Sequence, residues 1–195
     1  DLSDIRHSFR RFAELLPQDG CLIINADIPD WQELTEGLAC RVITYSTDPS
    51  NIKADYYPSE ITFDQQGHPS FSLHAGAPAS AHDADPVRRF QLRVPGTHNV
   101  SNAIAAIALA DWMNVDGAVT QKALLSFSGT DRRFEYKGSI GGVTIIDDYA
   151  HHPTEITATL SAAANCPHNT LWCVFQPHTY SRTKDLMDDF AKALC

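Results

Sequence analysis

An apolar run that ends in polar residues and then opens a helix limits the fold of this chain more than any other feature. The stretch GVTIIDDYAHHPTEI, residues 142–156, passes from apolar residues into acids, a tyrosine and two histidines before Pro153 starts a helical pattern. Proline suits a first helical turn because its missing N–H would have no partner there. Strands that alternate with helices predict an α/β fold with a parallel sheet, whose ligand sites lie beyond the carboxyl ends of the strands.

Candidate site residues follow two predicted strands, at residues 142–148 and 170–176. They are Asp147, Asp148, Tyr149 and His151 after the first, and Gln176, His178 and Arg182 after the second. We expect both clusters on one rim of the sheet, with Arg182 in the first turn of a helix, where the macrodipole favours a bound anion. The alternatives are a solvated turn with a helix cap for the acids, and an exposed arginine without a partner.

The rest of the chain has the same α/β character. An amphipathic helix at 1–16 precedes strands at 21–27 and 41–46, with a short helix through Trp31 and Leu34 between them. Short strands at 56–63, 64–74 and 87–94, with a small-residue loop at 75–86, predict an antiparallel flap on the sheet edge. Helices are expected at 99–113, at 116–127, from Pro153, and through Leu186 and Phe190.

Composition excludes several classes of protein. A net charge of -9 and a pI near 5.3 argue against nucleic acid or an anionic membrane as the main partner. No run of 18 apolar residues and no signal pattern is present, so we place the protein in the cytoplasm. Five cysteines without a CxxC pair indicate neither a disulfide framework nor a zinc ribbon, and we predict no metal ligand among them.

Two further motifs lie between these elements. VPGTHNVSNAIAA, residues 94–106, places His98 and Asn99 at the start of an alanine-rich helix, either as part of a packed and capped helix or as contacts for a base or ribose. GTDRRFEYKG, residues 129–138, carries Arg133 beside Glu135. That arginine suits either a phosphate or an ion pair with Glu135.

These four motifs in this order, VPGTHNVSNAIAA, GTDRRFEYKG, IIDDYAHHPTEI and FQPHTYSRT, resemble the Mur ligases. The resemblance covers the second half of the chain, whereas the first 93 residues carry no distinctive motif. It implies that residues 1–130 are the C-terminal portion of a central ATP-binding domain of the P-loop type. Residues 131–195 would then be the start of a Rossmann-like C-terminal ligase domain, incomplete as given.

The resemblance also implies a reaction, and it is strongest to members that add L-alanine. Such ligases use ATP and Mg²⁺ to phosphorylate the lactyl carboxylate of UDP-N-acetylmuramate. The amine of L-alanine then attacks the acyl phosphate, giving an amide and phosphate in peptidoglycan precursor synthesis. Arginines and Mg²⁺ would stabilise the charge that develops.

Residue roles follow only from matching the motifs. Asn99 resembles the adenine or ribose contact, Arg133 the arginine that reaches the nucleotide phosphates, and Asp148 an acid that binds ATP. The residues that resemble substrate contacts are Tyr149, His151, His178 and Arg182. We expect Arg133 and His151 to be catalytic, with His98 and His152 flanking the site.

The sequence departs from the Mur ligase pattern at two points, and three other functions stay open. Thr179 stands where many relatives have arginine. No Gly-Lys pair exists, so the Walker A loop is missing, and we therefore expect this chain alone to be inactive. Most Mg²⁺ ligands are expected upstream. The alternatives are a ligase that recycles a tripeptide onto UDP-N-acetylmuramate, a non-catalytic nucleotide-binding module, and a purely structural protein.

Overall fold

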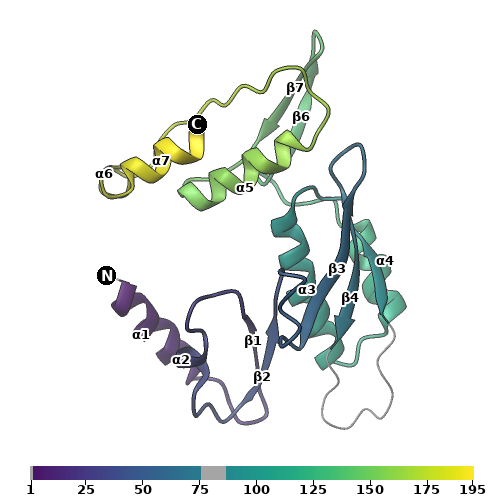
Figure 1. Ribbon diagram of the computed structural model, residues 1–195, viewed down its shortest axis with the longest axis vertical. Helices are drawn as coiled ribbons and strands as arrows, with labels where there is room; N and C mark the ends of the chain where they lie inside the picture. The colour runs from purple at the N-terminus through teal and green to yellow at the C-terminus, as the bar shows by residue number, and fades with distance from the viewer. Residues whose placement is uncertain (1, 76–86) are drawn as a thin grey trace. The chain divides into compact units, whose positions relative to one another are not determined.

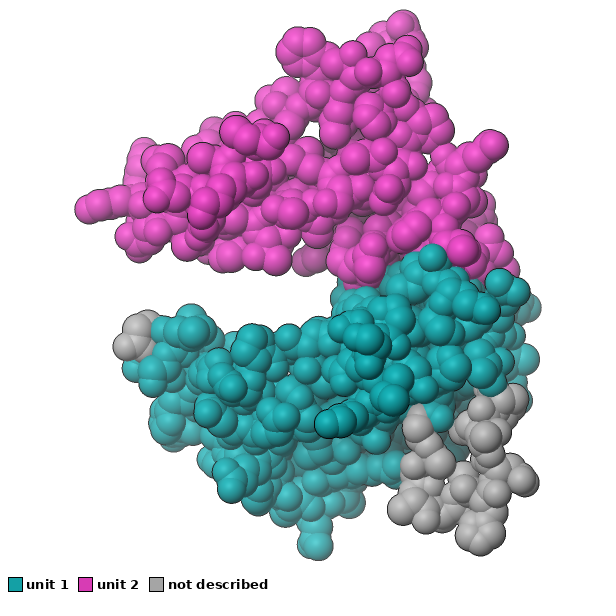
Figure 2. All heavy atoms as spheres, viewed as in Figure 1, with its two compact units in different colours: residues 1–61, 71–90, 100–123 teal, residues 62–70, 91–99, 124–195 magenta. Residues whose placement is uncertain are grey.

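The computed structural model describes residues 2–75 and 87–195, which form two compact units (Figures 1 and 2). Unit 1 comprises residues 1–61, 71–90 and 100–123, and unit 2 comprises residues 62–70, 91–99 and 124–195. The predicted loop at 75–86 lies, except for its first residue, outside the described residues. The predicted domain boundary at residue 130 stays a prediction.

A five-stranded sheet with strand order β1-β2-β3-β4-β5 organises the first part of the chain. The strands are β1 (Cys21–Asn25), β2 (Arg41–Tyr45), β3 (Tyr56–Phe63), β4 (Pro69–Ala75) and β5 (Arg88–Gln91). β1 and β2 pair in parallel, and α2 (Gln32–Thr35) lies between them in the sequence, so the predicted β-α-β unit is confirmed. β3 pairs with β2 in parallel, and a connection of five residues joins β3 to β4.

The apolar residues of α3 (Thr97–Trp112) form the most deeply buried helix face. Val100, Ala103, Ile104, Ile107 and Ala108 recur with helical spacing, and all five are buried. Asp111 at the end of the helix accepts hydrogen bonds from Arg88 on β5, at 2.9 Å, and from Tyr56 on β3, at 3.1 Å. The carboxylate therefore joins the helix to two strands of the sheet. α4 (Gly117–Ser126) follows after a short turn, as predicted.

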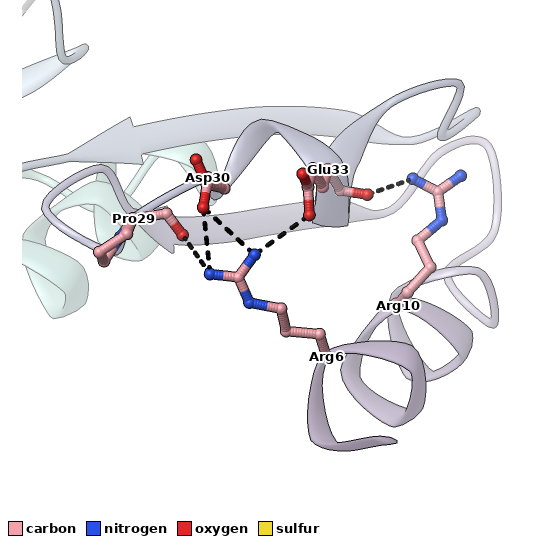
Figure 3. A network of polar contacts seen from close by, with 5 residues as sticks. All are labelled: Arg6, Arg10, Pro29, Asp30 and Glu33. Carbon is pink, nitrogen blue, oxygen red and sulfur yellow. Dashed lines mark hydrogen bonds and ion pairs between the residues drawn. The ribbon is translucent and has the colours of Figure 1, made fainter. Parts of the chain in front are cut away.

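In α1 (Leu2–Ala13) the polar face makes hydrogen bonds and ion pairs to residues 29–33, whereas the apolar face is largely exposed. Arg6 contacts Asp30, Glu33 and the carbonyl of Pro29, and Arg10 donates to the carbonyl of Glu33 (Figure 3). The amphipathic helix was predicted, yet its apolar stripe stays exposed. The stripe comprises Leu2, Ile5, Phe9 and Phe12. Ion pairs as exposed as these contribute little stability.

Unit 2 contains a hairpin that the sequence did not predict in full. β6 (Glu135–Ile140) pairs antiparallel with β7 (Val143–Asp147), and Gly141 and Gly142 form the turn with φ of 60° and 83°. Two glycines with positive φ suit a two-residue hairpin turn. β7 was predicted, whereas β6 was not. α5 (Pro153–Ala164) starts at the predicted proline.

The predicted strand at 170–176 is wrong. These residues pair with no strand in the described part of the chain, and Trp172 and Val174 are 85% and 99% exposed. An apolar run becomes a strand only when a neighbour accepts its backbone hydrogen bonds. The predicted last helix is divided at Leu186 into α6 (Tyr180–Asp185) and α7 (Met187–Leu194).

No helix in the described ranges is long and apolar enough to cross a membrane.

We expect Asp111→Ala to lower the free energy of unfolding by about 2 kcal/mol, because it leaves the half-buried Arg88 without its carboxylate. Tyr56→Phe removes one hydrogen bond from the same carboxylate and should cost about 1 kcal/mol. Urea denaturation of the two variants measures both changes. Equal stability of Asp111→Ala and the wild type would show that this contact does not stabilise unit 1.

Candidate functional site

The loop between β7 and α5 is held by its own polar side chains. Asp148 Oδ1 accepts the N–H of Ala150 at 2.7 Å, and the carbonyl of Tyr149 contacts His151 Nδ1 at 2.9 Å. The rings of Tyr149 and His151 lie 5.1 Å apart. The predicted cluster therefore folds into one ordered loop, with Asp148 and His151 partly buried and Tyr149 exposed.

A capping box fixes the start of α5. The side chain of His152 accepts the N–H of Thr154, and Glu155 accepts the N–H groups of His151 and His152 at 3.0 and 3.1 Å. Burial acts to raise the pKa of Glu155, but these donors and the two imidazoles outweigh it and leave the pKa below its ordinary value. The cap thus orients both histidines. His152, predicted only to flank the site, is the N-cap residue.

The turn at 130–134 lies against this loop. Phe134 N–H donates to Asp148 Oδ2 at 2.8 Å, and Tyr149 N–H donates to the carbonyl of Arg132 at 2.8 Å. The guanidinium of Arg132 lies 4.4 Å from the ring centre of Tyr149, a cation–π contact. Asp148 therefore connects the arginine motif to the end of β7.

Arg133 has no such contact. Its guanidinium makes no hydrogen bond or ion pair with any other residue in the described ranges, and the side chain is exposed. The alternative of an ion pair with Glu135 is wrong, because Glu135 instead bonds the N–H of Arg132 and the ammonium of Lys137. Arg133 is left with all its donors for an anion, and its planar set of N–H groups fits phosphate oxygens.

His98 and Asn99 lie in the same unit. Asn99 Nδ2 donates to the carbonyl of Pro95 at 2.7 Å and contacts His98 Nε2 at 3.2 Å. Burial lowers the pKa of His98, Asp148 opposes this effect and Arg133 adds to it. The structure therefore brings His98 within electrostatic reach of Arg133 and Asp148, two of the three predicted ATP-binding residues.

Gly96 permits that arrangement. Its φ is 97°, and a Cβ there would lie 2.7 Å from the His98 ring and 3.1 Å from Ala162 of α5. Only glycine adopts this conformation without strain and leaves room for the ring. The turn before α3 thus packs closely on α5.

The second predicted cluster does not join the first. His178 is exposed and follows the unpaired segment at 170–176, so its predicted place at a strand end is wrong. Arg182 donates to the carbonyl of His178 at 3.3 Å and lies in the first turn of α6, as predicted. Within the described residues, no hydrogen bond, ion pair or ring contact joins His178 or Arg182 to His151. One shared rim was predicted, and in the described residues the two clusters do not come together in this way.

A cavity of about 230 Å³ lies beside β7 within unit 2. Phe134, Asp147 and Asp148 line it together with α5 and residues 171–175. Glu135 and Glu155, which accept backbone N–H groups of Arg132 and His151, were not predicted as site residues. For Glu155 a signal existed, because an acid three residues after a cap position indicates a capping box.

The described residues contain no group of three or more His, Cys, Asp or Glu side chains that could hold a metal ion.

Two family models match the chain. The Mur ligase middle domain matches residues 1–110, and the Mur ligase glutamate ligase domain matches residues 132–195. The chain belongs to the Mur ligase family, and its mixed α/β fold is the one these proteins share.

Relatives and solved structures agree on the family. The chain is 50% identical to a UDP-N-acetylmuramate–L-alanine ligase of Lachnospira eligens and 48% identical to one of Agathobacter rectalis, all of it aligning to 40% of each protein. The crystal structure of the UDP-N-acetylmuramate–alanine ligase MurC of Thermotoga maritima is 28% identical with a TM-score of 0.71, covering all of this chain and 39% of that one. A murein peptide ligase of Psychrobacter arcticus is 25% identical with a TM-score of 0.59, covering 90% of this chain and 37% of its own.

The surroundings of His98 predict a measurable titration. NMR should find the pKa of His98 below its ordinary value of 6.5. Arg133→Gln should raise it, because the variant removes a cation that disfavours imidazolium. Arg132→Gln, in the same turn, is the control and should change it less. A pKa of His98 that does not respond to Arg133→Gln would contradict the proximity of the two side chains.

The same shift makes a prediction about stability. Because the folded state disfavours the proton on His98, this residue contributes stability above its unfolded pKa of about 6.5, and the contribution is lost as the pH falls from there through the lower folded pKa. His98→Gln should therefore lose less stability than the wild type between pH 7.5 and pH 5.5 in urea denaturation. His7→Gln, on the exposed helix α1, checks that the change belongs to position 98.

Proposed function

We propose that this chain is part of an ATP-dependent ligase that joins L-alanine to UDP-N-acetylmuramate. The observation that carries the proposal is Arg133, whose guanidinium bonds to no other described residue and lies in the turn that Asp148 holds. A cation placed in this way is suited to nucleotide phosphates. Membership of the Mur ligase family and the names of the relatives supply the choice of reaction.

The proposed reaction has two steps. The γ-phosphoryl group of ATP is transferred to the lactyl carboxylate of UDP-N-acetylmuramate, giving an acyl phosphate and ADP. The amine of L-alanine then attacks the acyl carbon, phosphate leaves, and the nitrogen loses a proton as the amide forms. Activation of the carboxylate is needed because a carboxylate anion is a poor electrophile.

We assign the nucleotide side of the reaction to Arg133, Asp148 and Asn99. Arg133 would neutralise charge on the transferred phosphoryl group, which is the main requirement of phosphoryl transfer. Asp148 would hold the turn that carries Arg133 and face the nucleotide. Asn99, beside His98 at the start of α3, would contact the adenine or ribose.

The substrate side is assigned to Tyr149, His151, His178 and Arg182. His151 is the best oriented of these, because its ring and its N–H are both held by neighbouring groups. Tyr149 presents an exposed ring beside it. For His178 and Arg182 the support is the motif alone, since no contact connects them to His151 in the described residues.

The chain spans about 40% of the length of the relatives it matches. The proposed activity is therefore that of a longer protein, with residues 1–130 in a central ATP-binding domain and residues 131–195 in a C-terminal ligase domain. We include Mg²⁺ in the proposal because phosphoryl transfer from ATP requires it. We assign its ligands to the part of the longer protein that carries the Walker A loop. We also propose a cytoplasmic location, as expected from the absence of a signal pattern in the sequence.

The recycling ligase that uses a tripeptide is the second candidate. The similarity to the Psychrobacter arcticus murein peptide ligase favours it. L-alanine is preferred because the reported relatives at 48–50% identity are alanine ligases.

A chimera tests the proposal. The chain replaces the matching 40% of the Lachnospira eligens ligase, and phosphate release is followed with ATP, UDP-N-acetylmuramate and either L-alanine or the tripeptide. We expect turnover with L-alanine and none from the chain alone. Turnover with the tripeptide only would assign the recycling reaction, and a chimera that folds but is inactive with both substrates would contradict the ligase proposal.

Arg133→Lys in that chimera should lower kcat/KM roughly 100-fold, because lysine cannot reproduce the planar set of donors. Arg132→Lys is the matched control, since it keeps a cation over the ring of Tyr149, and it should change kcat/KM little. An Arg133→Lys chimera as active as the unaltered chimera would remove Arg133 from the nucleotide site.

A further inference from the structure

The backbone on both sides of Arg133 is strained. Arg132 and Phe134 have φ of 57° and 50°, in the left-handed region. Each such residue other than glycine costs about 1 kcal/mol or more. Two of them flank one arginine, so the conformation of the turn must be held by contacts outside its own backbone.

Two carboxylates supply those contacts. Glu135 Oε2 accepts the N–H of Arg132 at 2.8 Å, and Asp148 Oδ2 accepts the N–H of Phe134 at 2.8 Å. Each strained residue therefore donates its N–H to a carboxylate, the kind of hydrogen bond that is stronger than one between neutral groups. The pKa of Glu135 lies below its ordinary value, first because of the Arg132 N–H and then because of Lys137, so its carboxylate form is favoured.

The side chains of Arg132, Arg133 and Phe134 have three different surroundings. Arg132 lies over the ring of Tyr149, and Phe134 lines the cavity beside β7. The side chain of Arg133, between them, is exposed, and its guanidinium makes no hydrogen bond or ion pair with another described residue. The outer two side chains anchor the turn, and the central one is presented to solvent.

We propose that Glu135, together with Asp148, is a positioning residue that holds the strained turn so that Arg133 faces a polyphosphate. The inference deepens the proposed function and rests on it, because the polyphosphate would be that of the ATP in the ligase reaction. Glu135 acts through Arg133 and needs no contact with the nucleotide. Removing the Glu135 carboxylate frees the Arg132 N–H, and the turn can then relax to an ordinary backbone conformation.

The direct test uses the chain itself and inorganic tripolyphosphate, with NMR shifts of residues 130–135 as the readout. The variants are Arg133→Ala, Glu135→Ala and the double variant. Asp131→Ala is the matched control, since Asp131 is an exposed acid of the same turn and makes no hydrogen bond to another described residue. It removes the same charge beside Arg133 without touching the bond to Arg132.

We expect Arg133→Ala and Glu135→Ala each to weaken tripolyphosphate binding, by about fivefold to tenfold for the arginine. The double variant should bind no more weakly than Arg133→Ala alone, because Glu135 acts only through that arginine. Asp131→Ala should bind at least as tightly as the wild type, since it removes a negative charge. Glu135→Gln keeps an oxygen acceptor for the Arg132 N–H and should recover most of the loss.

Three results would overturn the inference. They are a wild-type chain that does not bind tripolyphosphate, a Glu135→Ala variant that binds like the wild type, and a double variant weakened by the product of the two single effects. The last would mean that Glu135 affects binding independently of Arg133.

The chimera separates this inference from the proposed function. If the chimera ligates L-alanine but Glu135→Ala leaves its KM for ATP unchanged, the inference is wrong and the function stands. If the chimera is inactive while the tripolyphosphate cycle on the chain behaves as expected, the function is wrong and the positioning role of Glu135 stands.

Discussion

The carboxylate of Asp148 is the contact on which the rest of the candidate site depends. One oxygen accepts the N–H of Phe134 and the other accepts the N–H of Ala150, so a single side chain joins the arginine turn to the loop that enters α5. A carboxylate can do this because it has two acceptor oxygens, each of which can accept a different N–H group. Replacing it by an apolar side chain would leave both N–H groups without their partner.

The second constraint is the start of α5, which sets the direction in which the loop leaves the sheet. His152 and Glu155 share the cap, and Pro153 occupies the first helical position, where it has no N–H to satisfy. The same Glu155 that caps the helix also holds the N–H of His151. Secondary structure and site geometry therefore use the same hydrogen bonds, so a change in the cap would move the candidate substrate residues as well.

Local signals predicted much of this arrangement. Pro153 after a polar cluster predicted the start of α5, and the apolar run before Asp147 predicted β7, because both depend on residues that are adjacent in the sequence. The left-handed conformations of Arg132 and Phe134 could not be predicted, since neither residue favours positive φ. The N–H of Arg132 is held by the side chain of Glu135, and the N–H of Phe134 by that of Asp148, 14 residues away. Glu135 was considered only as a partner for an arginine side chain, whereas it bonds the backbone of Arg132 and the side chain of Lys137.

Apolar patterns in the sequence did not predict which surfaces are buried. The stripe on α1 and the run at 170–176 were both recognised as apolar, yet Phe9 and Trp172 are 61% and 85% exposed. Periodicity identifies which face would be buried, but burial needs a second surface, and the run at 170–176 also needs a neighbouring strand for its backbone. A helix can form without such a neighbour, because its hydrogen bonds are internal, which explains why α1 is present and the strand is not.

The exposure of Arg133 sets how strongly this chain could bind a phosphate. Two opposite charges 4 Å apart attract by about 1 kcal/mol in water and by about 4 kcal/mol at the lower effective dielectric near a protein surface. In this chain the guanidinium faces solvent, so the smaller figure applies and binding would weaken further with salt. A surface that closed over the turn and excluded water would increase the attraction without any change in Arg133 itself. The turn held by Glu135 and Asp148 therefore fixes the position of the Arg133 charge. The strength of its attraction to a phosphate depends on how far water is excluded around it.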